Sequence, residues 1–271
     1  FYKYEAIVVT GSFKTDKKFL KKFENLKIVS VFGVGYDGVD LNYCKKNKII
    51  ITNTPKVLTD DVADLALGLM MSLSRRINEA HNFILKKKWS KKPFDLTTSL
   101  TNKTVGIVGM GEIGKAVSKR VKSLSMRIVY YGPNEKNLNY KYFKDLKDMA
   151  SLIDVMVITC IGGIETKHLI NKNILKLMKP SSIIVNVSRG SVINEIDLLD
   201  ALKNNLISGA ALDVFKMEPK INIKFLKSKN VLLSPHNGSA TFDTREKMAK
   251  ISSQNILNYL SLNKLKNQVN F

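Results

Sequence analysis

The chain has 271 residues, 44% of them hydrophobic, so it is long enough for one large domain or two smaller ones. No apolar run approaches the roughly 18 residues that a membrane span needs, so we expect no membrane partner. The formal net charge is +21, but only six of the 44 basic residues are arginines. Because recognition of bases and phosphates favours arginine, we expect no specific nucleic-acid partner.

Short apolar runs alternate with helical segments over the first 56 residues. Strands are expected at residues 5–10, 26–32 and 49–52, and helices at residues 16–23 and 40–46. This alternation predicts a parallel, doubly wound sheet. The second strand ends in a loop with three glycines in six residues, 33–38, whose backbone can curl around an anion. The alternative is a plain turn between strand and helix.

A long helix is expected from Thr59 to about Leu85, because Asp60 and Asp61 would stabilise its first turn. Residues 62–73 are apolar nearly all round, which is typical of a buried helix. The helix leads into a lysine-rich stretch that holds the only tryptophan, Trp89. This stretch is either a solvated surface loop or a funnel for anions beside a binding site.

The rest of the chain is organised around residues 105–114, an apolar β-branched run that ends in three glycines and leads into an amphipathic segment. Gly109 permits a tight turn, Gly111 lets the backbone approach a pyrophosphate, and Gly114 lets helix and strand pack closely. The anion would meet the unpaired N–H groups at the start of the helix. The stretch therefore predicts a dinucleotide-binding turn.

The strand expected at residues 127–131 ends in Gly132, Pro133 and Asn134, and this end decides which cofactor is preferred. An acid at Gly132 would hold the ribose hydroxyl of NAD, and it is absent. An arginine for the extra phosphate of NADP is absent as well. The open glycine and the basic surroundings favour NADP, and NAD remains the alternative.

Polar residues follow three later strands, expected at residues 182–187, 210–214 and 231–233. Arg189 can hold a carboxylate with two parallel hydrogen bonds, and His236 can give a proton near neutral pH. Glu218 would favour the protonated histidine and fix its orientation. Alternatively, the arginine forms a surface ion pair, the histidine caps a helix and the glutamate belongs to a turn. No cluster of metal ligands is evident, and the two cysteines favour a reducing, cytoplasmic compartment.

With these motifs, the chain resembles the D-isomer-specific 2-hydroxyacid dehydrogenases, in particular the glyoxylate/hydroxypyruvate and hydroxyphenylpyruvate reductase branch. Eight segments carry the resemblance in the family's order, at residues 34–37, 52–55, 59–66, 109–114, 186–190, 211–215, 218–219 and 235–236. The resemblance implies an α/β fold with two doubly wound parallel-sheet domains. Residues 57–238 would form a Rossmann NAD(P)-binding domain. Residues 1–56 and a returning helix in residues 239–271 would form a smaller, flavodoxin-like substrate domain.

The resemblance also implies roles for single residues. Arg189 would hold the carboxylate and carbonyl of a small 2-oxo acid, His236 would give the proton, and Glu218 would tune His236. The backbone N–H groups of Val34 and Gly35 would bind the carboxylate. The cofactor would contact a larger set: Gly109, Met110, Gly111, Glu112, Ile113, Gly114, Gly132, Pro133, Asn134, Cys160, Ile161, Thr166, Val187, Asp213, His236 and Gly238. A homodimer is expected, with the long helix and the following arm at the interface and Trp89 reaching the partner's active site.

Two departures from the family qualify these expectations. The family's proteins usually begin earlier, so we expect the substrate domain to lack its first strand and helix. After Cys160 the family usually has a proline-bearing loop, whereas Ile161-Gly162-Gly163-Ile164 stands here. A non-catalytic dinucleotide sensor or corepressor-like protein on the same fold therefore remains the alternative to a reductase.

Overall fold

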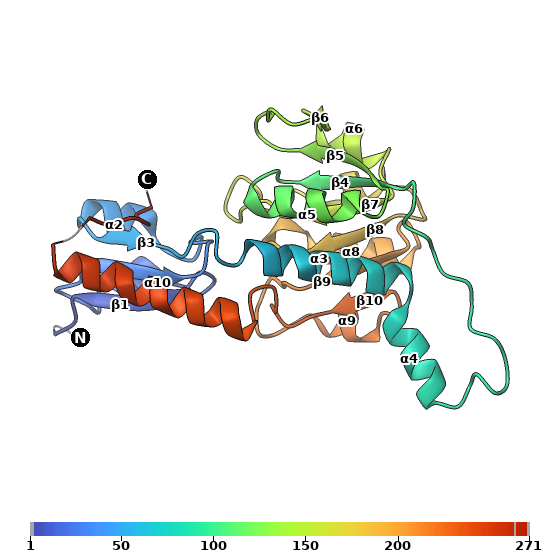
Figure 1. Cartoon of the computed structure of the whole chain (residues 1–271), viewed down its shortest axis with the longest axis horizontal. Coiled ribbons are helices and arrows are strands. Elements are labelled where there is room, and N and C mark those ends of the chain that lie inside the picture. Colours follow the sequence, from blue (N-terminus) through green and yellow to red (C-terminus); the bar gives the residue numbers. More distant parts are fainter. Residues whose placement is uncertain (1–2, 263, 270–271) are drawn as a thin grey trace. The chain divides into compact units, whose positions relative to one another are not determined.

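The computed structural model describes residues 3–262 and 264–269. The chain divides into two compact units (Figure 1). The smaller unit takes in the chain up to Asp61 and again from Ser239, and the larger unit is Val62–Gly238. Both units are built on parallel sheets flanked by helices, so the predicted α/β fold class is confirmed.

The smaller unit holds a three-stranded parallel sheet in the order β1-β2-β3, with β1 at Ala6–Thr10, β2 at Ile28–Phe32 and β3 at Ile50–Thr52. Its helices are α1 (Lys17–Leu20), α2 (Leu41–Lys46) and α10 (Phe242–Leu260). The side chains of Asp16 and Asp40 accept backbone N–H groups at the starts of α1 and α2, as N-capping predicts. Helix α10, red in Figure 1, packs on β2, where the hydroxyls of Ser30 and Ser252 lie 2.8 Å apart.

The larger unit holds a seven-stranded parallel sheet in the order β10-β9-β8-β7-β4-β5-β6. After β4, the strands β5 and β6 are added on one side of it, and the strands from β7 to β10 are added on the other side. The carboxyl ends of β4 and β7 therefore form a switch point, where open α/β sheets bind ligands. The strands are β4 (Thr104–Val108), β5 (Arg127–Tyr131), β6 (Lys141–Phe143), β7 (Val155–Ile158), β8 (Ile183–Asn186), β9 (Gly209–Leu212) and β10 (Val231–Leu233).

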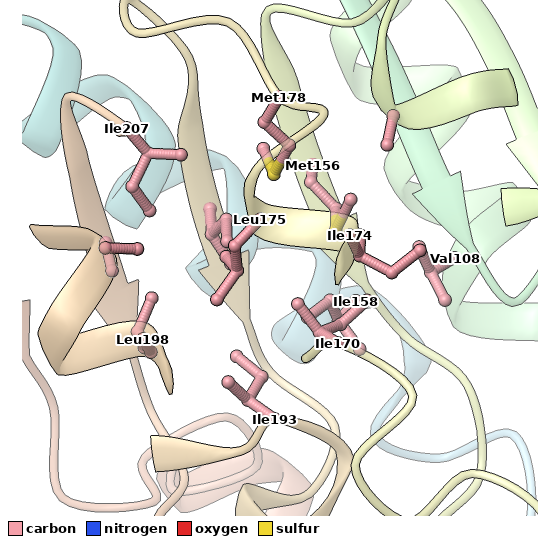
Figure 2. Close-up of a cluster of buried hydrophobic side chains, with 14 of the residues drawn as sticks. Val108, Met156, Ile158, Ile170, Ile174, Leu175, Met178, Ile193, Leu198 and Ile207 are labelled. Carbon is pink, nitrogen blue, oxygen red and sulfur yellow. The ribbon is translucent and has the colours of Figure 1, made fainter. Parts of the chain in front are cut away.

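Helices cover both faces of this sheet and bury its apolar side chains. Figure 2 shows one such cluster, in which Met156 and Ile158 of β7 meet Ile174 and Leu175 of a short helix. The helices that follow the first unit's β3 are α3 (Thr59–Ser74), α5 (Glu112–Lys122), α6 (Leu146–Ala150), α7 (Lys172–Leu175), α8 (Glu195–Lys203) and α9 (Ile223–Lys227), with a 3-10 turn, η1, at Gly190–Val192. Helix α4 (Ile77–Leu85) has no buried residue and does not cover the sheet.

The prediction of one continuous helix from Thr59 to Leu85 is wrong. The helix breaks into α3 and α4 because Arg76 adopts a left-handed backbone conformation, with φ of 50°. The Arg76 guanidinium bonds Glu79 at 2.6 Å and lies over the ring of Phe94, 5.1 Å from its centroid. These contacts compensate the backbone strain of a non-glycine residue in that region.

Within residues 3–262 and 264–269, no helix is long and apolar enough to cross a membrane. The same residues contain no group of three or more histidine, cysteine, aspartate or glutamate side chains that could hold a metal ion.

Candidate active site

Three neighbouring strands of the larger unit deliver the predicted catalytic side chains to one edge of the sheet. Arg189 follows β8, Glu218 follows β9, and His236 follows β10. Because these parallel strands are adjacent in the order β10-β9-β8, their carboxyl ends lie side by side. The three residues, spread over 48 positions (189 to 236) of the chain, are therefore brought together at this edge.

Glu218 and His236 form a close pair. Glu218 Oε2 lies 2.7 Å from His236 Nδ1, and Oε1 accepts the backbone N–H of Phe215 at 2.8 Å. Both glutamate oxygens are thus engaged, which fixes the plane of the imidazole ring. A proton on Nδ1 is the one shared with the carboxylate, so Nε2 is the nitrogen left to exchange a proton with a ligand.

The environment of Glu218 keeps it ionised. Burial alone would raise the pKa of Glu218, but the hydrogen bond from His236, the Phe215 N–H and the positive charge of Arg189 outweigh it, and the pKa lies below its ordinary value. The carboxylate that orients the imidazole ring is therefore charged. The pair therefore has the geometry and charge of a general acid with its orienting group.

Asp213 organises the loop that carries His236. Its side chain is 1% exposed, and Oδ1 accepts the hydroxyl of Ser234 and the N–H of Asn237, each at 2.6 Å. Oδ2 accepts the N–H of Gly238 at 3.0 Å, and the backbone carbonyl of Asp213 accepts the N–H of His236 at 2.8 Å. These bonds hold His236 in a left-handed conformation, with φ of 52°. A contact of Asp213 with the cofactor stays a prediction.

Asn186 shapes the loop of Arg189 in a similar way. Its Oδ1 accepts the N–H of Ser188 at 3.0 Å, and its Nδ2 donates to the carbonyl of Arg189 at 3.0 Å. Ser188 in turn donates its hydroxyl hydrogen to the carbonyl of Cys160. Arg189 itself is half-buried, and its guanidinium also bonds the carbonyl of Ser188 at 2.9 Å. The arginine is consequently presented from a rigid loop.

The glycine-rich turn fits a dinucleotide. Gly109 has φ of 101°, and a Cβ there would lie 2.5 Å from the backbone of Cys160, so β4 and β7 meet at a point where only glycine fits. A Cβ on Gly114 would lie 2.3 Å from the carbonyl of Gly109, so helix α5 also packs closely. A Cβ on Gly111 would meet nothing within 4 Å. The start of α5 is thus open to a pyrophosphate.

The other residues of this turn divide by exposure. Glu112 is exposed and pairs with Lys115 at 3.3 Å, Ile113 is half-buried, and Met110 is buried. Only the backbone of Met110 is therefore offered to a ligand at the turn. Contacts of the three with the cofactor remain predictions.

Two tyrosine hydroxyls fix the turn after β5. The buried phenol of Tyr130 accepts the N–H of Lys136 at 2.8 Å and donates to its carbonyl at 3.2 Å. Tyr142 of β6 donates to the carbonyl of Gly132 at 3.1 Å. A side chain at Gly132 would meet nothing within 4 Å, and Pro133 and Asn134 are exposed. The turn is ordered, and its surface beside Gly132 is open.

The loop after β7 is largely exposed. Ile161 and Ile164 are 81% and 93% exposed, whereas Thr166 closes the loop by donating to the carbonyl of Ile161 at 2.7 Å. Burial raises the pKa of the Cys160 thiol to about 11, so this cysteine is no nucleophile. Val187 is buried, so only its backbone is accessible to a ligand.

In the smaller unit, the loop of Val34 and Gly35 is tied by its carbonyl groups. The carbonyl of Gly33 accepts the N–H of Thr54 at 2.9 Å, and the carbonyl of Val34 accepts Nδ2 of Asn53 at 2.9 Å. The N–H groups of Val34 and Gly35 have no partner within residues 3–262 and 264–269. The loop therefore offers two backbone donors to an anion.

Sequence reasoning missed the residues that hold these loops, namely Asn53, Asn186 and Ser234, and it gave Asp213 only a cofactor contact. A polar residue directly at the end of a strand was the available signal, because such side chains often bond the turn that follows them.

Comparison with known proteins identifies the chain. A model of the D-isomer-specific 2-hydroxyacid dehydrogenase NAD-binding domain matches residues 67–238. The chain belongs to this family. The dehydrogenase is 39% identical over 252 residues to glyoxylate/hydroxypyruvate reductase A of Arabidopsis thaliana, a match covering 93% of this chain and 80% of that protein. It is 41% identical over 266 residues to a glyoxylate reductase of Thermococcus litoralis, with the same coverage.

Solved structures agree with this assignment. The dehydrogenase matches an NADPH-dependent glyoxylate/hydroxypyruvate reductase of Sinorhizobium meliloti, solved with NADP and malonate, with a TM-score of 0.95 and 34% identity, covering 99% of this chain and 84% of that one. The protein is thus an NAD(P)-dependent oxidoreductase, as predicted. These relatives are named as reductases, so the alternative of a non-catalytic dinucleotide sensor has no support in them.

Proposed function

We propose that the enzyme reduces a small 2-oxo acid, of the glyoxylate, hydroxypyruvate or hydroxyphenylpyruvate type, to the D-2-hydroxy acid. The observation that carries this proposal is the Glu218–His236 pair, which stands beside Arg189 at three adjacent strand ends. Relatives named as reductases of these acids support it, including the hydroxyphenylpyruvate reductase of Plectranthus scutellarioides at 39% identity.

In this mechanism the larger unit supplies the acid. The cofactor, held at the glycine-rich turn from Gly109 to Gly114, would supply the hydride that the carbonyl carbon accepts. His236 gives the proton from Nε2 to the carbonyl oxygen, so the ketone becomes an alcohol, and Glu218 stabilises the protonated ring before transfer. Arg189 holds the substrate's carboxylate and carbonyl and polarises the C=O bond.

The smaller unit supplies carboxylate recognition in this proposal. The N–H groups of Val34 and Gly35, which have no partner among the described residues, bind the substrate carboxylate, and the carbonyl groups of Gly33 and Val34 are already engaged. We accordingly assign residues 1–56 and 239–271 to the substrate domain and residues 57–238 to NAD(P) binding. The family match over residues 67–238 supports the second assignment.

We further propose that NADP is preferred over NAD. No acid occupies Gly132, so nothing at this position would repel a 2′-phosphate. The Tyr130 hydroxyl fixes the backbone of Lys136, whose exposed ammonium lies on the same turn and can pair with that phosphate. The prediction is a lower dissociation constant for 2′,5′-ADP than for 5′-AMP. Gly132→Asp should reverse this order.

A homodimer is also proposed. Helix α4 has no buried residue, and apolar side chains on it and on the following arm are exposed, including Ile84, Leu85 and Trp89. An exposed apolar surface of this kind marks an interface, and a second copy is the partner we propose. Leu85→Lys should lower the mass seen by sedimentation, whereas Leu226→Lys, on α9, should not.

Free thiols at both Cys44 and Cys160 support a cytoplasmic location.

The deciding experiment is NADPH and NADH oxidation against glyoxylate, hydroxypyruvate, pyruvate, phenylpyruvate and hydroxyphenylpyruvate. Turnover that ranks these acids, with NADPH the better donor, supports the proposal. Absence of turnover on every acid, from protein shown to bind NADPH, contradicts it.

A further inference from the structure

The loop that holds Val34 and Gly35 is anchored by a chain of asparagine side chains within the smaller unit. Asn53, at the end of β3, donates Nδ2 to the carbonyl of Val34 at 2.9 Å. Asn255, on α10, donates Nδ2 to the carbonyl of Asn53 at 3.1 Å. Asn267, near the end of the chain, donates Nδ2 to Oδ1 of Asn255 at 2.9 Å. Four positions between Val34 and Asn267 are thus joined in series.

Backbone hydrogen bonds hold the Asn267 end of this series of asparagines in place. The carbonyl of Asn267 accepts the N–H of Asn53 at 3.2 Å, and the N–H of Val269 donates to the carbonyl of Ile51 at 2.8 Å. Thr52 and Gln268 form an antiparallel bridge. The segment from Asn267 to Val269 therefore lies along β3 as an added edge, and it closes a ring of hydrogen bonds with Asn53.

Burial makes these bonds strong determinants of geometry. Asn255 is 2% exposed, although Ser253 and Gln254, which precede it on the helix, are exposed. A buried amide must find partners for its donor and its acceptor, and leaving one unmet is costly. Asn255 meets both requirements through Asn53 and Asn267 and so has one favourable orientation.

From this arrangement we propose that Asn53, Asn255 and Asn267 are positioning residues for substrate binding. They hold the Val34 carbonyl inward, so that the N–H groups of Val34 and Gly35 stay free for the carboxylate. The segment Asn267–Val269 thereby contributes to recognition of a substrate that it does not touch. The inference rests on the proposed function, in which these two N–H groups bind a 2-oxo acid.

Asn255→Asp is the sharpest test, because it keeps the acceptor for Asn267 and removes the donor to Asn53. We expect the KM for glyoxylate to rise about tenfold, with kcat changed less than about twofold and the NADPH dissociation constant unchanged. Asn267→Ala should raise KM about threefold and is the milder variant if the first folds poorly. Asn258→Asp is the matched control, because on the same helix it only accepts a bond from the exposed Gln254; its KM should equal that of the wild type.

A second measurement does not need turnover. In ¹⁵N-labelled protein with NADP bound, the amide signals of Val34 and Gly35 should shift on titration with oxalate, and Asn255→Asp should weaken this titration about tenfold while Asn258→Asp leaves it unchanged. An unchanged KM and an unchanged oxalate titration in folded Asn255→Asp would overturn the positioning role. An equal loss of kcat and NADPH binding would overturn it as well, because it would show general damage. A wild type that lacks turnover but shows the oxalate shifts would reject only the proposed function.

Discussion

The protein holds the loop of His236 through its backbone N–H groups and the loop of Val34 through its backbone carbonyl groups. In the His236 loop, the carboxylate of Asp213 takes up the N–H groups of Asn237 and Gly238. In the Val34 loop, the protein takes up carbonyl groups and leaves two N–H groups without a partner among the residues described. A loop whose N–H groups are filled can bind an anion only through a side chain. A loop whose carbonyls are filled presents its own backbone to an anion.

The largest effect should come from removing the side chain that the first loop presents. His236→Ala should lower kcat about 10²–10⁴-fold, because it removes the proposed proton donor. NADPH affinity should stay within about threefold, since the glycine-rich turn is untouched. Stopped-flow reduction and fluorescence titration separate the two quantities, and a variant with near-normal kcat would remove His236 from the mechanism.

The second-largest effect is expected when the hydrogen bonds between Asp213 and the loop of His236 are broken. Asp213→Asn replaces an oxygen that accepts the Gly238 N–H with a donor, so two donors would face each other. We expect a loss of about 2–3 kcal/mol in the free energy of unfolding and a kcat lower by roughly tenfold. Urea unfolding and steady-state kinetics measure these changes. Asp200→Asn, which keeps its bond from Asn204 on an exposed face, should change neither.

A smaller effect concerns Glu218, whose pKa lies below its ordinary value of 4.5 in the folded protein. Its ionised form therefore stabilises the fold above pH 4.5, and this contribution disappears as the pH falls through the lower folded value. The wild type should lose stability relative to Glu218→Gln over that acidic range. Urea unfolding at pH 3 to 7 tests this, and a constant difference between the two proteins would contradict it.

The smallest effect is expected at the second loop. Val34→Ala removes most of a half-buried side chain but leaves the backbone N–H in place, so the KM for glyoxylate should rise less than about threefold. A rise of a hundredfold would show that the side chain, rather than the backbone, binds the carboxylate. Together with His236→Ala, this variant measures how differently the two loops depend on side chains.

Much of this arrangement could be predicted from the sequence, because it depends on local patterns. Alternating apolar runs predicted the parallel sheets, and the glycines from Gly109 to Gly114 predicted the turn at the switch point. Arg189, Glu218 and His236 each follow a predicted strand, and adjacency of those strands was enough to bring them together.

The features that were missed have no local pattern in the sequence that would predict them. The helix break at Arg76 is stabilised by contacts of its side chain with Glu79 and Phe94. No glycine or proline in the sequence marks this break. Strand β6 has three residues, too few for a periodic pattern. The three-residue asparagine chain connects positions more than 200 residues apart, and asparagine on a helix is ordinarily a surface residue.

The two free N–H groups of the Val34 loop also bear on how such an enzyme can change its substrate. A point mutation alters a side chain but leaves the peptide group of a non-proline residue intact, so the carboxylate site that we propose here would be insulated from most genetic change. If the proposal holds, the side chains around this loop would be free to vary in size and polarity while the group common to all 2-oxo acids is still bound.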